Sequence, residues 1–230
     1  QVMKIGLAGR VYKDTKILLT KLFLGDTNGV IMPRLSKGGI YNISRNLKQN
    51  LDFYKFPQGS NTAIIISELN LSRRTSITYN KKEFPLKKIN YKKIDWLHIA
   101  YIDDLPTSCN IKTDKCPVSI DFCTLQDRED FLPIIDSCEL VFDSRERKGL
   151  YRNINTKTPI ILHDKHGCEC IVNNKIILSK EIKPKKNLQV NGAGDIFAGF
   201  FISNYYNNSL AHAIKKTAGQ TKKYITKNEI

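Results

Sequence analysis

A turn of small residues followed by an acid and an apolar run is the segment best suited to chemistry. Gly192, Ala193 and Gly194 carry little or no side chain, so the backbone there can approach a ligand closely. Apolar residues at helical spacing over residues 196–201 predict that this turn opens a helix. Backbone N–H groups at the start of a helix favour an anion, most often a phosphate. Asp195 would repel a static phosphate, but it suits a base that deprotonates a hydroxyl attacking the phosphate, which indicates phosphoryl transfer. The alternative is a glycine turn, capped by Asp195, before a buried helix.

The tetrapeptide Gly192-Ala193-Gly194-Asp195 and the apolar run behind it resemble the C-terminal signature of the ribokinase-like (PfkB) carbohydrate kinases. The resemblance covers most of the chain, as a shortened version of the family pattern. It implies an ATP-dependent kinase that phosphorylates a hydroxyl of a sugar or sugar-like molecule. In that reading Asp195 is the general base, and the amides of the small-residue turn stabilise charge on the transferred group.

Two segments near the N-terminus are similar to the substrate-binding segments of that family. Asp14 follows the first predicted strand, where the family has an aspartate that binds substrate hydroxyls, and a carboxylate can accept two such hydrogen bonds. Gly38, Gly39 and Asn42 resemble the Gly-Gly…Asn motif, although the spacing from Gly39 to Asn42 is one residue shorter than usual. In the family the glycines admit the sugar and the asparagine binds its hydroxyls. The alternatives are a surface-turn aspartate and a glycine turn before a helix.

A third segment resembles the family's magnesium motif. Asp143 and Glu146 fall where the family carries Asn-x-x-Glu, which helps to hold Mg²⁺ beside the nucleotide phosphates, mostly through water. Carboxylate oxygens suit Mg²⁺, which keeps most of its waters. The alternative is a solvated helix start at which the helix dipole favours acidic residues.

Three departures from the family pattern support a second hypothesis. Gln189 and Val190 stand where the family usually has Asp-Thr, and only Gly167 remains of a phosphate turn expected over residues 162–167. Residues 47–62 are too few for the strand–helix unit usually found there. These differences favour, as the alternative, a degenerate relative that binds a sugar or nucleotide without chemistry and acts as a regulator.

A cluster of histidines and cysteines offers a different kind of site. His163, His166, Cys168 and Cys170 lie within eight residues of one another, and all four are zinc-ligand types. Their spacing matches no common zinc module, and the two cysteines fit alternate positions of a strand. A zinc site therefore stays an alternative to a structural hairpin.

The arrangement of apolar segments predicts which elements position these residues. Strand-like segments alternate with polar or helical stretches, which predicts an α/β fold with a three-layer, mostly parallel central sheet and helices on both faces. Ligands of such sheets bind beyond the carboxyl ends of the strands. The resemblance adds a small β-sheet lid, from about residues 15–35 and 62–80, to a single domain spanning residues 1–230. We expect strands at residues 4–7, 62–67, 75–79, 96–100, 118–122, 140–142, 159–162, 170–173 and 176–178, and helices at 126–135 and after Ser209.

Composition limits the class of protein and its surroundings. Hydrophobic residues make up 41% of the 230 residues, which is enough for a sizeable core in one domain or in a domain with a small lid. No apolar stretch reaches the length of a membrane span, so we expect no membrane association. Six scattered cysteines show no disulfide framework and favour a reducing cytoplasm.

The net charge of +15 bears on the partners. A basic surface can bind nucleic acid or concentrate anionic ligands such as ATP. The lysines are dispersed and no arginine-rich arm is present, so nucleic acid is not the expected partner. We expect a sugar or nucleoside-like small molecule instead, and a homodimer in which uncovered lid strands pair with a second copy.

Overall fold

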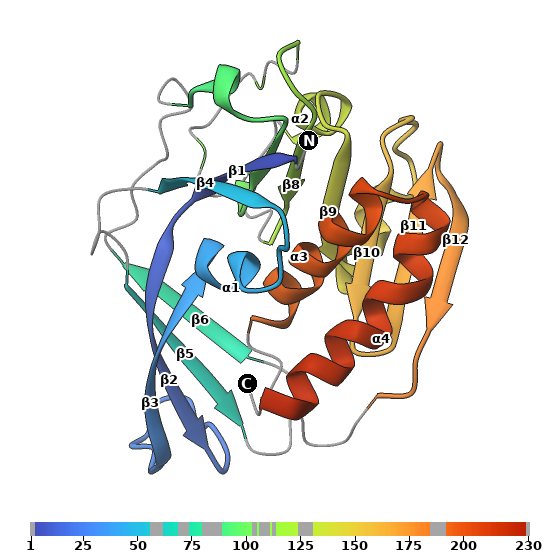
Figure 1. Cartoon of the computed structure of the whole chain (residues 1–230). Helices are drawn as coiled ribbons and strands as arrows, with labels where there is room; N and C mark the ends of the chain where they lie inside the picture. The colour runs from blue at the N-terminus through green and yellow to red at the C-terminus, as the bar shows by residue number, and fades with distance from the viewer. Residues whose placement is uncertain are drawn as a thin grey trace.

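The computed structural model describes residues 3–55, 62–68, 74–79, 89–102, 105, 111, 114–123, 131–184 and 192–228. Its larger sheet has the strand order β12-β11-β10-β9-β8-β7-β1-β4, drawn in Figure 1. The strands from β4 to β10 in that order are parallel, and β11 and β12 are antiparallel. The bounds are β1 (Lys4–Gly9), β4 (Asn50–Lys55), β7 (Trp96–Ile99), β8 (Val118–Asp121), β9 (Leu140–Ser144), β10 (Ile160–Asp164), β11 (Gly167–Val172) and β12 (Lys175–Glu181).

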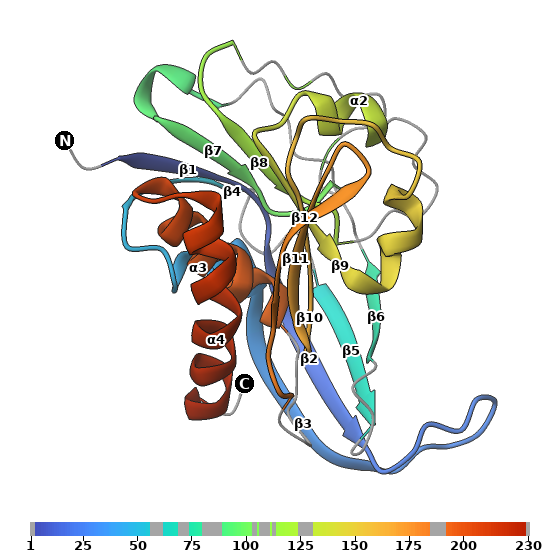
Figure 2. The ribbon, with the colours of Figure 1, turned by 90° about the vertical axis from the view of Figure 1, so that its right-hand side faces the viewer.

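Helices cover both faces of this sheet. Figure 2 shows α3 (Ala193–Tyr206) and α4 (Leu210–Asn228) on one face, and α2 (Phe131–Asp136) on the other. Every residue of β7 and β8 is buried, as expected for parallel strands covered on both sides. Two apolar clusters follow from this, one between the sheet and α3 and α4, and one on the side of α2. The predicted three-layer α/β architecture is confirmed.

A second, smaller sheet has the strand order β3-β2-β5-β6 and projects from one end of the larger sheet (Figure 2). Its strands are β2 (Val11–Leu19), β3 (Val30–Gly39), β5 (Thr62–Glu68) and β6 (Arg74–Tyr79). Strand β2 follows β1 after one residue, so the small sheet is continuous with β1, the strand next to the β4 edge of the large sheet. This sheet is the small β-sheet expected from the resemblance.

The remaining elements are short, and several begin where the sequence predicted. Helix α1 (Ile40–Ser44) follows β3 directly, and two 3-10 helices, η2 (Tyr91–Lys93) and η4 (Arg145–Tyr151), connect strands. Helix α3 starts directly after Gly192, and Ser209 caps α4 by accepting a hydrogen bond from the His212 amide at 3.2 Å. Of the helix predicted at residues 126–135, residues 126–130 lie outside the described residues. Within the described helices, none combines the length and the apolar character needed to cross a membrane.

Candidate active site

Three segments that are distant in sequence converge on the carboxyl group of Asp195. Asp195 lies in the first turn of α3 and is 6% exposed. The side-chain amide of Asn42, in α1, donates to Asp195 Oδ2 at 3.1 Å, and the Tyr101 hydroxyl donates to Oδ1 at 2.6 Å. Tyr101 follows the end of β7, so the carboxylate lies near the carboxyl ends of the parallel strands, where ligands bind in such sheets.

The glycines of the turn before α3 make room for neighbouring side chains. Gly192 has a φ of 79°, and a Cβ on it would lie 2.6 Å from Asn42 Nδ2. A Cβ on Gly194 would lie 3.2 Å from Cε1 of His163. The first helical hydrogen bond runs from the Ile196 amide to the Gly192 carbonyl, so the amides of residues 193–195 precede the helical ladder. Two of these amides, those of Ala193 and Gly194, belong to the anion hole predicted at Gly192, Ala193 and Gly194, which stays a prediction.

The glycine pair of β3 also accommodates the chain itself. Asp14, in β2, is 7% exposed, and its Oδ2 lies 2.4 Å from the position that a Cβ on Gly38 would take. Gly39 has a φ of 65°, and a Cβ there would lie 2.2 Å from the Arg10 carbonyl oxygen and 3.0 Å from Cδ2 of Tyr12. The glycines therefore seat Asp14 and Tyr12 at the base of the small sheet.

Tyr12 joins this region to Asp195. Its ring meets the ring of Tyr101 edge to face, with centroids 6.0 Å apart and planes at 61°. Tyr101 in turn donates to Asp195. The structure thus brings Asn42, Gly192 and Asp195 into direct contact, and it links Gly39 to them through two tyrosine rings.

Asp143 and Glu146 occupy two different environments. Asp143 is fully buried at the end of β9, where Oδ1 accepts from Arg147 Nε at 2.7 Å and Oδ2 accepts from the Tyr151 hydroxyl at 2.5 Å. Glu146 is exposed at the start of η4. A hydrated magnesium ion does not fit beside the enclosed Asp143 carboxylate, whereas the Glu146 carboxylate is open to solvent. The magnesium role predicted for Asp143 and Glu146 is untested, and of the two carboxylates that of Glu146 is the one accessible to a hydrated ion.

A further carboxyl group, that of Asp121 at the end of β8, interacts with the carboxyl groups of both Asp195 and Asp143. Burial raises the pKa of Asp121 well above its usual range, and the carboxylates of Asp195 and Asp143 raise it further. Burial, with the neighbouring Asp195 charge next in size, also raises the pKa of Tyr101. The Tyr101 hydroxyl therefore keeps its proton and acts as a hydrogen-bond donor to Asp195 over the physiological pH range.

His163 packs beneath the turn. Its ring stacks on Phe197 of α3, with centroids 4.4 Å apart, and β11 pairs Cys168 with it across the β10–β11 hairpin. Cys168 Sγ contacts the Ile214 carbonyl oxygen at 3.6 Å, so this thiol faces α4. Among the residues that the structure describes, no group of three or more His, Cys, Asp or Glu side chains is arranged to hold a metal ion.

The partly buried imidazole of His163, whose Nε2 is enclosed, predicts a loss of stability in acid. Burial lowers the pKa of His163 from 6.5 to about 4, and the neighbouring Asp164 offsets part of this. Below about pH 6.5 the unfolded chain binds a proton that the folded chain does not, so this contribution to stability falls as pH drops towards 4. Between pH 7 and pH 5 the free energy of unfolding should fall in both proteins, and the fall should be roughly 1–2 kcal/mol smaller in His163→Leu than in the unchanged chain. Urea unfolding at the two pH values measures this difference.

The matched control is His166→Leu, because the His166 imidazole is exposed on the same hairpin. This variant keeps the His163 imidazole, so it should retain the loss of stability in acid that is assigned to His163. An identical pH dependence in His163→Leu would contradict the assignment of acid sensitivity to His163.

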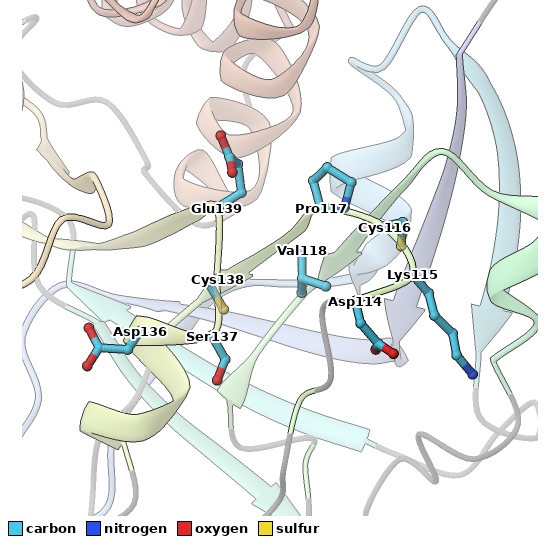
Figure 3. Close-up of a pocket in the computed structure, with 9 residues that line it drawn as sticks. All are labelled: Asp114, Lys115, Cys116, Pro117, Val118, Asp136, Ser137, Cys138 and Glu139. Carbon is cyan, nitrogen blue, oxygen red and sulfur yellow. The ribbon is translucent and has the colours of Figure 1, made fainter.

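A cavity of about 380 Å³ lies elsewhere in the molecule (Figure 3). Its lining includes Asp114, Cys116, Cys138 and Glu139, which precede β8 and β9. These residues lie at the amino ends of the parallel strands, whereas Asp195 lies near their carboxyl ends. The cavity is therefore separate from the candidate active site.

The sequence did not indicate Tyr12 or Tyr101 as site residues, and it suggested His163 only as a zinc-ligand type, although all three lie against the predicted residues. The usable signal was position, because Tyr101 directly follows a buried parallel strand. Tyr12 and His163 carry no comparable signal, since their contacts come from the small sheet and from the packing of α3.

Comparison with known proteins identifies the fold. No protein-family model matches the chain, and no curated protein does. The ribokinase of Thermotoga maritima is similar in structure, with a TM-score of 0.71, 12% identity, and coverage of 97% of this chain and 93% of that one. The Arabidopsis thaliana ribokinase complexed with ribose and ATP has a TM-score of 0.68 at 11% identity, and the match covers 96% of this chain and 92% of that one. The Burkholderia thailandensis nucleoside kinase in complex with inosine has a TM-score of 0.67 at 12% identity, and the match covers 95% of this chain and 89% of that one. The chain therefore has the ribokinase fold.

Proposed function

We propose that the chain is an ATP-dependent kinase that transfers a phosphoryl group to a hydroxyl of a sugar or nucleoside-like small molecule. The observation that carries this proposal is the Asp195 carboxylate, held by Asn42 and Tyr101 at the start of α3, next to a turn of small residues. The complexes of similar fold with ribose and ATP, and with inosine, support the substrate class.

In this mechanism Asp195 accepts the proton of the acceptor hydroxyl as its oxygen attacks phosphorus. The amides at residues 193–195 stabilise the negative charge of the transferred group. The transition state of phosphoryl transfer is loose, so catalysis consists mainly of positioning and electrostatics. Aligning both reactants can lower the barrier by roughly 7–11 kcal/mol. Asp14, Gly38, Gly39 and Asn42 orient the acceptor, and Asn42 also holds the base.

ATP supplies the phosphoryl group, and a magnesium ion, when bound, neutralises charge on the phosphates. Glu146 is the residue best suited to hold such an ion through water, because its carboxylate is exposed. Asp143 contributes to the same region by fixing Arg147, whose guanidinium bonds it.

We also propose that the small sheet acts as a lid and pairs with a second copy of the chain. Val30, Ile31, Leu35 and Ile77 are large apolar residues that the small sheet leaves about half or more exposed. A homodimer would cover them. We place the protein in the cytoplasm, since the described cysteines are free thiols.

A non-catalytic sugar- or nucleotide-binding regulator is the second candidate. One observation favours it: Arg145 bonds Asp164 at 3.3 Å and Glu181 at 2.5 Å. Asp164 is the last residue of β10 before the β10–β11 turn, where a phosphate turn was expected and only Gly167 matches. A phosphate at this turn would have to compete with the Asp164 carboxylate.

The deciding experiment measures ADP release over a panel of sugars and nucleosides, with binding of each measured in parallel by calorimetry. Acceptor-dependent ADP release that disappears in Asp195→Asn supports the kinase. Saturable binding without ADP release from any acceptor would overturn the kinase proposal and support the regulator.

A further inference from the structure

We infer that Tyr101 is a positioning residue that orients the Asp195 carboxylate and ties it to the small sheet through Tyr12. This inference rests on the proposed function, in which Asp195 is the base. It adds a residue that the Gly-Ala-Gly-Asp pattern does not contain and that comes from a different part of the fold.

The first step is the geometry of the carboxylate. The Tyr101 hydroxyl and the Asn42 amide donate to different oxygens of Asp195, at 2.6 Å and 3.1 Å. Rotation of the carboxyl group would break at least one of these bonds. Each oxygen still has acceptor capacity, since an ionised carboxylate has about four lone-pair sites. The acceptor hydroxyl can therefore bond Asp195 while Tyr101 and Asn42 remain in place.

The second step is the charge around the site. Asp121, from the end of β8, faces both Asp195 and Tyr101, and the Cys123 thiol that follows β8 also interacts with Tyr101. Asp143 and Arg147 act on Asp121 with opposite signs. Neighbouring acids disfavour an ionised Asp195, whereas hydrogen bonds donated to the carboxylate favour it. Tyr101 supplies the shorter of these two hydrogen bonds, 2.6 Å against 3.1 Å from Asn42.

The third step is the link to the small sheet. The Tyr12 ring in β2 packs edge to face against the Tyr101 ring and occupies space that Gly39 leaves open. Such aromatic pairs have a preferred geometry, so Tyr12 restricts the orientation of the Tyr101 ring. The position of the small sheet and the orientation of the base are thereby connected.

The test is Tyr101→Phe, which keeps the ring against Tyr12 and removes the donor. We expect the titration of the Asp195 carboxyl group to move up by about one pH unit. Carboxyl-carbon NMR measures this titration, with the resonance assigned from its absence in Asp195→Asn. The acid limb of the kcat profile should move by the same amount, with the KM for the acceptor unchanged.

The matched control is Tyr205→Phe. Tyr205 lies in α3, at the other end of the helix from Asp195, and its hydroxyl donates to the Glu139 carboxylate at 3.2 Å. Loss of this hydroxyl should therefore leave the Asp195 titration unchanged. An Asp195 titration that does not move in folded Tyr101→Phe overturns the inference. If no acceptor is phosphorylated even by the unchanged chain, the proposed function fails, and the NMR titration still decides whether Tyr101 holds Asp195.

Discussion

Replacing Asp195 with asparagine should reduce turnover by about 10²–10⁴-fold, the usual contribution of a general base. Asparagine has nearly the same shape, but it cannot accept the proton of the acceptor hydroxyl. The NH₂ group of the new asparagine would face either the Asn42 amide or the Tyr101 hydroxyl, both of which donate in the unchanged chain. Two donors would then meet where a donor and an acceptor met before. Folding and nucleotide binding should persist, because the turn and α3 are unaltered. ADP release and thermal unfolding of the purified variant measure the two effects.

The control for this variant is Asp52→Asn. Asp52, in the edge strand β4, forms a partly exposed ion pair with Lys4 at 2.9 Å, and such pairs contribute little. We expect unchanged turnover in this control. Normal turnover in Asp195→Asn would remove Asp195 from the mechanism.

Replacing Gly39 with alanine should destabilise the fold by about 3 kcal/mol. The φ of 65° is unfavourable for any residue with a Cβ, and the new methyl group would lie 2.2 Å from the Arg10 carbonyl oxygen. That oxygen belongs to the backbone between the two sheets, so relief requires movement of β1 or β2. The displacement of Tyr12 should also lower turnover. Urea unfolding at pH 7 measures the loss of stability.

Gly149→Ala is the matched substitution. Nothing lies within 4 Å of a Cβ at Gly149, and its φ is not positive, so the expected change is within about 0.5 kcal/mol. Equal stability of Gly39→Ala and Gly149→Ala would show that the backbone at Gly39 tolerates a side chain.

The sequence alone predicted those elements whose residues alternate or run in buried apolar groups. Strands β7, β8 and β9 are short apolar runs that become parallel strands covered on both faces. Helix α3 follows from its apolar spacing and the small residues in front of it. The approach of Asn42 to Asp195 agrees with both residues belonging to one site, although 153 positions separate them.

Strand β4 escaped prediction, and β3 was covered only in part by the lid expected over residues 15–35, for identifiable reasons. Strand β3 contains Pro33 and ends in Gly38 and Gly39, which normally argue against a strand. It lies at the edge of the small sheet, where a proline without an amide proton is tolerated. Strand β4 lies in residues 47–62, which seemed too short for a strand–helix unit, and it pairs with β1 at the edge of the large sheet.

The surroundings of Asp143 were not predictable from its motif. Arg147 lies four residues later and Tyr151 eight residues later, and both turn back onto the carboxylate through η4. The sequence shows these residues as a basic stretch, and only the path of η4 makes them partners. Tyr101 is similar, because its role depends on the loop after β7 and on Tyr12.

The junction at Arg10 has a consequence for how the two sheets can move. Arg10 separates β1 from β2, and its carbonyl oxygen accepts a hydrogen bond from the Ile40 amide at 3.1 Å, where β3 passes into α1 (Figure 1). The chain thus passes into β2 and out of β3 at the same point, the Arg10–Ile40 hydrogen bond. Tilting β2 and β3 about this point would turn the first residues of α1, which carry the amide of Asn42. A movement of the small sheet and the loss of one donor to the Asp195 carboxylate would then be a single motion.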